Sequence, residues 1–140
     1  MAGHQVKEGD MKFLVAYNGS DESKAALHLA REHALVFGAK VYVMTSMEGG
    51  VREKIQEIQK TVSDLEYAQN FMAEKDIVCE VRQMVRGLAP GEDLVRFAKE
   101  EEIDHIFVGI EKKSKTQKIL LGSTSQYIIL KASCPVTTIK

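Results

Sequence analysis

Residues 122–125 (GSTS) place a glycine and three consecutive hydroxyl side chains in front of an apolar stretch with helical spacing. The first N–H groups of a helix have no intrahelical acceptor, and the helix dipole favours an anion at this end. Gly122 would let a phosphate approach the backbone closely. The hydroxyls of Ser123, Thr124 and Ser125 would add hydrogen-bond donors. A Ser-Thr-Ser sequence at a helix start is also often only a cap.

A cluster of lysines precedes this segment and would add positive potential that attracts a polyphosphate. The same cluster, in a predicted loop over residues 111–118, could equally be a solvated surface. The lysines are Lys112, Lys113, Lys115 and Lys118.

Two glycine-containing turns follow apolar segments that read as strands. One turn is residues 18–20 (NGS), and the other begins at Gly109. Ligands of open parallel sheets bind beyond the carboxyl ends of the strands, where the strand order reverses. If the two preceding strands are neighbours, these turns face each other across a crevice.

Enzymatic chemistry is not indicated by the remaining polar residues. No Ser-His-Asp arrangement, paired carboxylates or metal-type histidine spacing stands out. Residues 19–23 (GSDES) only partly match the phosphate loop of ATP pyrophosphatases, because a second glycine is absent. We therefore predict a protein that is not an enzyme, with slow ATP hydrolysis left open.

Apolar strand-like segments alternate with amphipathic helical segments along the chain. Five such strands and their intervening helices predict one open parallel sheet with helices on both faces. We expect Ser20 to cap the first helix and Gly38 to end it, and Ser123 and Gln126 to form a capping box. Ile128, Ile129 and Leu130 are expected to pack inward. The predicted strands span residues 12–17, 40–46, 77–85, 104–110 and 136–140, and the helices span residues 20–37, 51–75, 90–102 and the segment from 123 onward.

Composition limits the cellular setting. The 140 residues carry a formal net charge of −1, which does not favour nucleic acid, and no apolar run could span a membrane. Cys79 and Cys134 suggest buried thiols in a reducing compartment, so we expect a cytoplasmic protein. Residues 1–10 read as a disordered or tag-like extension, and residues 11–140 read as one domain.

Short motifs along nearly the whole chain resemble those of the universal stress protein family. They are residues 14–20 (LVAYNGS), 38–39 (GA), 86–90 (RGLAP), 104–109 (DHIFVG), 121–123 (LGS) and 134–136 (CPV). The resemblance implies a Rossmann-like sheet of order 3-2-1-4-5, of the adenine nucleotide alpha hydrolase type. It also implies a homodimer through the C-terminal strand.

Family members that bind ATP resemble one another in a Gly-x2-Gly-x9-Gly-Ser/Thr motif, which here reads Gly109-x2-Lys112-x9-Gly122-Ser123. Lys112 replaces the middle glycine, where a side chain could block the backbone or could itself reach a phosphate. Asn18 replaces an aspartate near the ribose, which keeps an acceptor oxygen but loses the charge.

The resemblance assigns the base to a pocket that includes Ala16 and the backbone of Ser46. It assigns ribose and phosphates, with Mg²⁺ bridging the phosphates, to residues 109–113 and 123–125. The complete set of predicted site residues is Ala16, Tyr17, Asn18, Ser46, Gly109, Ile110, Glu111, Lys112, Lys113, Gly122, Ser123, Thr124 and Ser125.

Two functions follow from this resemblance. The first is a stress-response module regulated by ATP or another adenine nucleotide. The second is a dimeric protein-interaction module of the same fold without nucleotide, whose protein partners the sequence does not identify. Lys112 is the residue that distinguishes the two functions, because its side chain could either block nucleotide binding or contact a phosphate.

Overall fold

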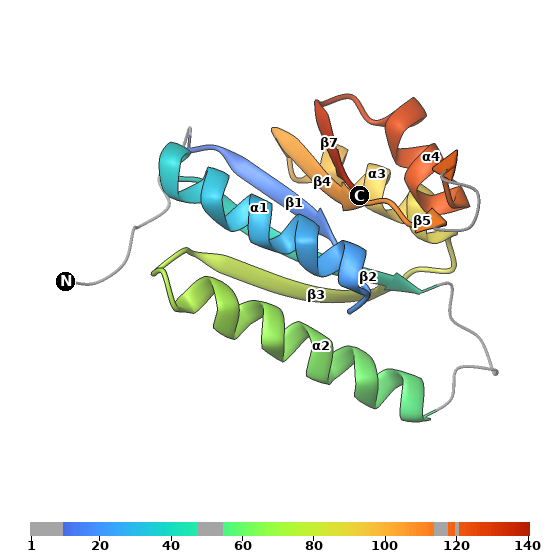
Figure 1. The fold of residues 1–140 in the computed structure, drawn as a ribbon, viewed down its shortest axis with the longest axis horizontal. Helices are drawn as coiled ribbons and strands as arrows, with labels where there is room; N and C mark the ends of the chain where they lie inside the picture. Colours follow the sequence, from blue (N-terminus) through green and yellow to red (C-terminus); the bar gives the residue numbers. More distant parts are fainter. Residues whose placement is uncertain (1–9, 48–54, 114–117, 120) are drawn as a thin grey trace.

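The computed structural model describes residues 10–47, 55–113, 118–119 and 121–140, drawn in colour in Figure 1. For residues 112, 113, 118 and 119 the backbone is described. The predictions on residues 1–9, on the helix start at residues 51–54 and on Lys115 lie outside this part of the chain.

Five parallel strands form the central sheet in the order β3-β2-β1-β4-β7. The order matches the predicted 3-2-1-4-5 once two short strands before β7 are set aside, so the predicted fold is confirmed. The strands are β1 (Lys12–Ala16), β2 (Lys40–Met47), β3 (Cys79–Val85), β4 (His105–Gly109) and β7 (Val136–Ile139).

The prediction of an unstructured lysine-rich loop was wrong in part. β5 (Lys112–Lys113) and β6 (Lys118–Ile119) pair as an antiparallel two-stranded ladder, with Lys112 opposite Ile119. In a loop, the backbone N–H and C=O groups of this polar segment would be hydrogen-bonded by water. In the ladder, they have backbone partners in the opposite strand. Lys112 therefore occupies an extended backbone position in a strand.

The four helices of the described residues cover the two faces of the sheet (Figure 1). α1 and α2 pack on one face around a core that includes Phe13, Val15 and Phe107. α3 and α4 pack on the other face around Leu14 and Ile106. The helices are α1 (Asp21–Phe37), α2 (Ile55–Ala73), α3 (Pro90–Glu100) and α4 (Ser123–Lys131).

The ends of α1 confirm the local predictions. The Ser20 hydroxyl accepts a hydrogen bond from the Ser23 N–H at 3.2 Å, which satisfies one donor of the first turn. Gly38 ends the helix with φ of 64°, a left-handed conformation that glycine adopts without steric cost. These two residues fix where the turn after β1 becomes a helix.

The start of α4 differs from the prediction. Gly122, and not Ser123, is the N-cap residue, and no side chain of the described residues caps this helix. The expected capping box was wrong because the helix begins one residue early, which places Ser123 inside its first turn. Gly122 carries no side-chain acceptor, so the first N–H groups of α4 keep no local partner of that kind.

The inward face of α4 is narrower than expected. Ile128 is fully buried, but Ile129 and Leu130 are 39% and 69% exposed, so their predicted inward packing was wrong. Ser125 and Ile128 are the buried residues of this nine-residue helix, and their spacing of three leaves neighbouring positions on the outer side.

The remaining features of the fold are the edges of the sheet, the two cysteines and the lengths of the helices. β3 and β7 are the edge strands of the five-stranded sheet. Cys79 and Cys134 are free and only half-buried, so the expected burial is partial, and burial raises the pKa of the Cys79 thiol to about 12. In the described part of the chain, the helices are too short or too polar to cross a bilayer.

Candidate functional site

The turns that follow β1 and β4 lie side by side at the carboxyl edge of the sheet. β1 and β4 pair in parallel, with Ala16 opposite Val108, so both strands end at the same level. A cavity of about 200 Å³ opens between these turns, the end of β2 and the first turns of α3 and α4. Its lining residues are Ala16, Tyr17, Asn18, Met44, Thr45, Ser46, Pro90, Leu94, Val108, Gly109, Thr124 and Ser125.

Some of the predicted site residues meet at this cavity, and the others lie around it. The predicted residues that line it are Ala16, Tyr17, Asn18, Ser46, Gly109, Thr124 and Ser125. Ile110 is buried, and its N–H donates to the Ile139 carbonyl at 2.6 Å, whereas Glu111 is exposed. Gly122 caps α4, and Lys112 and Lys113 form β5.

A second hollow, also of about 200 Å³, adjoins the first. It is bordered by Ser123 and Tyr127 of α4 and by the start of α3, and Pro90 and Thr124 border both hollows. Glu92 also lines it, and a carboxylate there disfavours a second negative charge. Ser123 thus faces a different space from Thr124 and Ser125, although the sequence groups all three.

Asn18 shapes the turn after β1. Its side-chain oxygen accepts the Ser20 N–H at 3.0 Å, which is an Asx turn. Its own N–H donates to the Ser23 hydroxyl at 3.4 Å. The acceptor oxygen that was expected to face a ligand is therefore engaged within the turn, and the side-chain NH2 is the group left as a donor.

Tyr17 contributes to the site through its backbone. Its N–H donates to the Met44 carbonyl at 3.0 Å, and its carbonyl accepts the Thr45 hydroxyl at 2.6 Å. The ring belongs to the core under α1 and α2, where the hydroxyl is buried without a partner among the described residues. Burial, followed by the nearby Asp64 carboxylate, raises the pKa of Tyr17 to about 12.

Gly109 has a packing role that is independent of any ligand. A side chain on this residue would overlap with the backbone carbonyl of Glu22 in the first turn of α1. Gly122, by contrast, has open space among the described residues where a side chain would be, and its φ of −65° suits any residue. The two glycines of the motif therefore do different things in the fold.

The start of α4 is electrostatically distinct from the other helix starts. α1, α2 and α3 each carry acidic residues in the first turn, and α4 carries none. Such acids neutralise the positive end of a helix. α4 has no such acids in its first turn, and its N-terminus lies beside the cavity. The positive end of this helix dipole is therefore directed into the cavity at Thr124 and Ser125.

Sequence reasoning missed a buried charged pair behind the cavity. Asp93 has no exposed surface; its carboxylate accepts the Ser46 hydroxyl at 2.6 Å and the Arg86 Nε at 2.6 Å. Hydrogen bonding to Glu100 and to Asp93 raises the pKa of Arg86. The motif of residues 86–90 was noticed in the sequence. The pairing of Asp93 with Arg86 and Ser46 was not, because it forms only where α3, the turn after β3 and the end of β2 meet in the fold.

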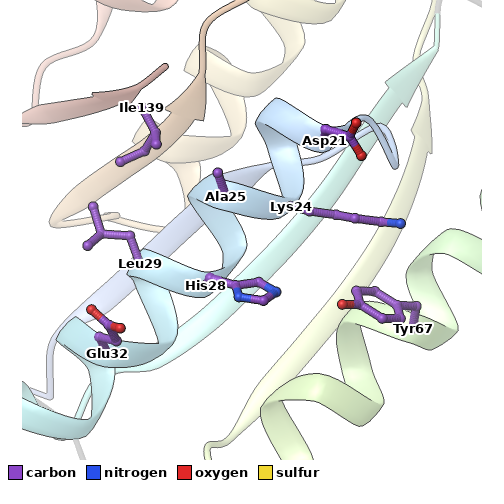
Figure 2. Close-up of a pocket in the computed structure, with 8 residues that line it drawn as sticks. All are labelled: Asp21, Lys24, Ala25, His28, Leu29, Glu32, Tyr67 and Ile139. Atoms are coloured by element: carbon purple, nitrogen blue, oxygen red, sulfur yellow. The ribbon is translucent and has the colours of Figure 1, made fainter.

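A larger depression of about 660 Å³ lies on the outer side of α1 (Figure 2). Figure 2 shows polar side chains of α1, such as Lys24 and Glu32, with Tyr67 of α2 on one flank and Ile139 of β7 on another. It is a broad, mixed-charge surface. Within the ranges that the structure describes, no cluster of three metal-binding side chains occurs.

The sheet order and the cavity at the strand ends define a Rossmann-like α/β protein with a crevice at the point where the strand order reverses. A model of the universal stress protein family matches residues 11–140, so the chain belongs to that family, as its motifs predicted. Universal stress protein YxiE of Bacillus subtilis is 31% identical over 147 residues, covering 92% of this chain and 98% of that protein.

Two solved structures from Archaeoglobus fulgidus are similar to this chain. One universal stress protein is 35% identical, with 93% of each chain covered and a TM-score of 0.82. Another, described in complex with dAMP, is 31% identical with a TM-score of 0.76, covering 93% of this chain and 97% of that one.

The different roles of the two motif glycines give a first prediction. Gly109→Ser should lower the free energy of unfolding by roughly 2–3 kcal/mol, because the new side chain must displace the α1 backbone. Gly122→Ser should change it by no more than about 0.5 kcal/mol, because the site is open and serine is a favoured N-cap. Urea denaturation of both variants measures the difference, and equal effects would contradict the packing role.

Proposed function

We propose that this protein binds an adenine nucleotide in the cavity at the ends of β1 and β4 and acts as a regulatory module in the stress response. The observation that carries the proposal is the cavity itself, bounded by Ala16, Ser46 and Gly109 and adjoining the uncapped start of α4. The similarity to a universal stress protein described in complex with dAMP supports it.

The size and lining of the cavity suit a base. Ligand pockets commonly span roughly 300–1,000 Å³, so a cavity of about 200 Å³ would enclose part of a nucleotide. The side chains of Ala16, Leu94 and Val108 offer apolar surface for a purine ring. The ribose and phosphates would then lie outside, over Gly109 and the N–H groups of Thr124 and Ser125.

ATP is one candidate ligand, with Mg²⁺ held by its phosphates. No carboxylate is among the described residues that line the cavity, so the cation would depend on phosphate oxygens. The positive end of α4 would stabilise a monophosphate or a triphosphate. We propose residues 109–113, Gly122, Thr124 and Ser125 as the phosphate side of the site, with Ser123 beside it in the adjoining hollow. Ala16, Tyr17, Asn18 and Ser46 form the base and ribose side.

Binding without catalysis is the activity that this lining supports. Among the described residues around the cavity, no imidazole or carboxylate is placed to act as a general base. The Tyr17 hydroxyl lies in the core under α1 and α2, and its raised pKa keeps it protonated. Nucleotide occupancy would therefore be the signal that the protein passes to protein partners.

A homodimer through β7 is the assembly that we propose. Among the described strands β7 pairs with β4 alone, and the carbonyls of Pro135 and Ile139 accept the N–H groups of Ile106 and Ile110. Because alternate residues of a strand point their backbone groups to opposite sides, Thr138 directs its N–H to the free edge. Pairing with a second copy would cover this edge.

A cytoplasmic location is also part of the proposal. The free thiols of Cys79 and Cys134 are typical of a reducing compartment.

A nucleotide-free interaction module is the second candidate function. It is favoured by Lys112, which stands where nucleotide-binding relatives are expected to have a glycine. In this protein Lys112 is part of the β5–β6 ladder.

Ligand binding is tested by heat denaturation and titration. AMP and ATP with Mg²⁺ should raise the midpoint of unfolding, because a ligand that binds the folded state stabilises it. Ala16→Leu should weaken binding at least about tenfold by filling the base cavity, which corresponds to about 1.4 kcal/mol. Isothermal titration calorimetry measures the affinity.

Ala25→Leu is the matched control, because it makes the same change in the depression on α1. It should leave nucleotide affinity unchanged. No thermal shift with any adenine nucleotide, together with no nucleotide released from purified denatured protein, would favour the interaction module.

The dimer is tested at the free edge of β7. Thr138→Pro removes the outward N–H without removing a bond to β4, so it should convert a dimer to a monomer. Size-exclusion chromatography with light scattering measures the mass, and Thr138→Val, which keeps the N–H, should remain dimeric. A monomeric parent protein, or a proline variant that stays dimeric, would contradict pairing through this edge.

A further inference from the structure

The buried carboxylate of Asp93 connects the cavity wall to the turn after β3. One oxygen accepts the Ser46 hydroxyl and the other accepts Arg86 Nε, each at 2.6 Å. Asp93 itself is fully buried, while Ser46 is only partly buried and lines the cavity. Ser46 is therefore the one member of this network that a ligand in the cavity can reach.

Arg86 holds the carboxylate in a fixed orientation. Besides its Nε contact, a terminal nitrogen donates to the backbone carbonyl of Asp93 at 3.3 Å, and the other donates to Glu100 at 2.7 Å. An arginine side chain can only donate hydrogen bonds. The oxygen of Asp93 that faces Arg86 must therefore be an acceptor, and its hydrogen bond to the guanidinium is a charge-assisted one.

The carboxylate of Asp93 in turn fixes the direction of the Ser46 hydroxyl, which donates to it. A carboxylate offers no donor, so the hydrogen bond between them must use the serine proton. The serine oxygen then has only its lone pairs left for a ligand. Toward the cavity, Ser46 is a hydrogen-bond acceptor, although a free serine hydroxyl could act in either sense.

We infer that Asp93, acting through Ser46, makes this cavity select a purine with an amino group at position 6 over one with an oxo group there. The inference rests on the proposed nucleotide binding and adds the residues that determine base specificity. An amino group donates to the Ser46 oxygen. An oxo group would bring a second acceptor against it, and both oxygens would be left without a donor.

A single isosteric substitution reverses the direction of the hydrogen bond between residue 93 and Ser46. In Asp93→Asn, the new amide oxygen must still face Arg86, which only donates. The amide NH2 then faces Ser46 and donates to its oxygen, so the serine proton is released toward the cavity. The variant should lose the preference for the 6-amino purine and gain affinity for the 6-oxo purine.

The experiment compares AMP with IMP by isothermal titration calorimetry. The parent protein should bind AMP at least about tenfold more tightly than IMP, as one lost hydrogen bond with an unpaired oxygen implies. Asp93→Asn should bring the ratio to one or below. Ser46→Ala keeps the Asp93–Arg86 pair and should lower the ratio, mainly through weaker AMP binding.

Glu100→Gln is the matched control, because it removes another carboxylate that pairs with Arg86 without touching Ser46. It should leave the AMP-to-IMP ratio unchanged. A ratio that is the same in the parent, Ser46→Ala and Asp93→Asn proteins would overturn this inference alone. A parent protein that binds neither nucleotide would overturn the proposed function, and this inference with it. If Asp93→Asn does not fold, the Ser46→Ala ratio decides.

Discussion

The backbone contact between the end of β4 and the first turn of α1 is the constraint on which the site depends. Gly109 has no side chain, so the Glu22 carbonyl can approach it closely. This approach brings the turn after β1 beside the turn after β4 and leaves the cavity between them open toward α4. A bulkier residue at position 109 would separate the two turns, and the cavity would lose a wall.

The walls of the cavity formed by β2 and α3 are held in place by a second interaction, which is electrostatic. Asp93 in α3 holds the end of β2 through Ser46 and the turn after β3 through Arg86. A buried carboxylate is tolerated only when it is paired and hydrogen-bonded, and this one is both. Gly91 in the same helix leaves room for the backbone of Thr124 in α4. α3 thus positions both the base side and the phosphate side of the proposed site.

Much of the fold could be predicted because its signals are local. The alternation of apolar strands with amphipathic helices, the Ser20 cap and the Gly38 stop depend on neighbouring residues, and the structure bears them out. The strand order came from the family resemblance. The N-cap at Gly122 and the exposure of Ile129 depend on how α4 packs on the sheet, so sequence pattern alone gave the wrong answer there.

The candidate site was predicted where strand ends and glycine turns marked it, and missed where distant residues meet. Ser46 was expected to contribute its backbone, and no sequence pattern linked its hydroxyl to Asp93. If an adenine nucleotide occupies the cavity between the two turns, AMP must perturb the amide groups that surround it. Amide NMR spectra of ¹⁵N-labelled protein titrated with AMP should therefore show the largest shift changes at Asn18, Ser46, Thr124 and Ser125. Changes confined to the depression on α1, or no changes at all, would rule out binding in this cavity.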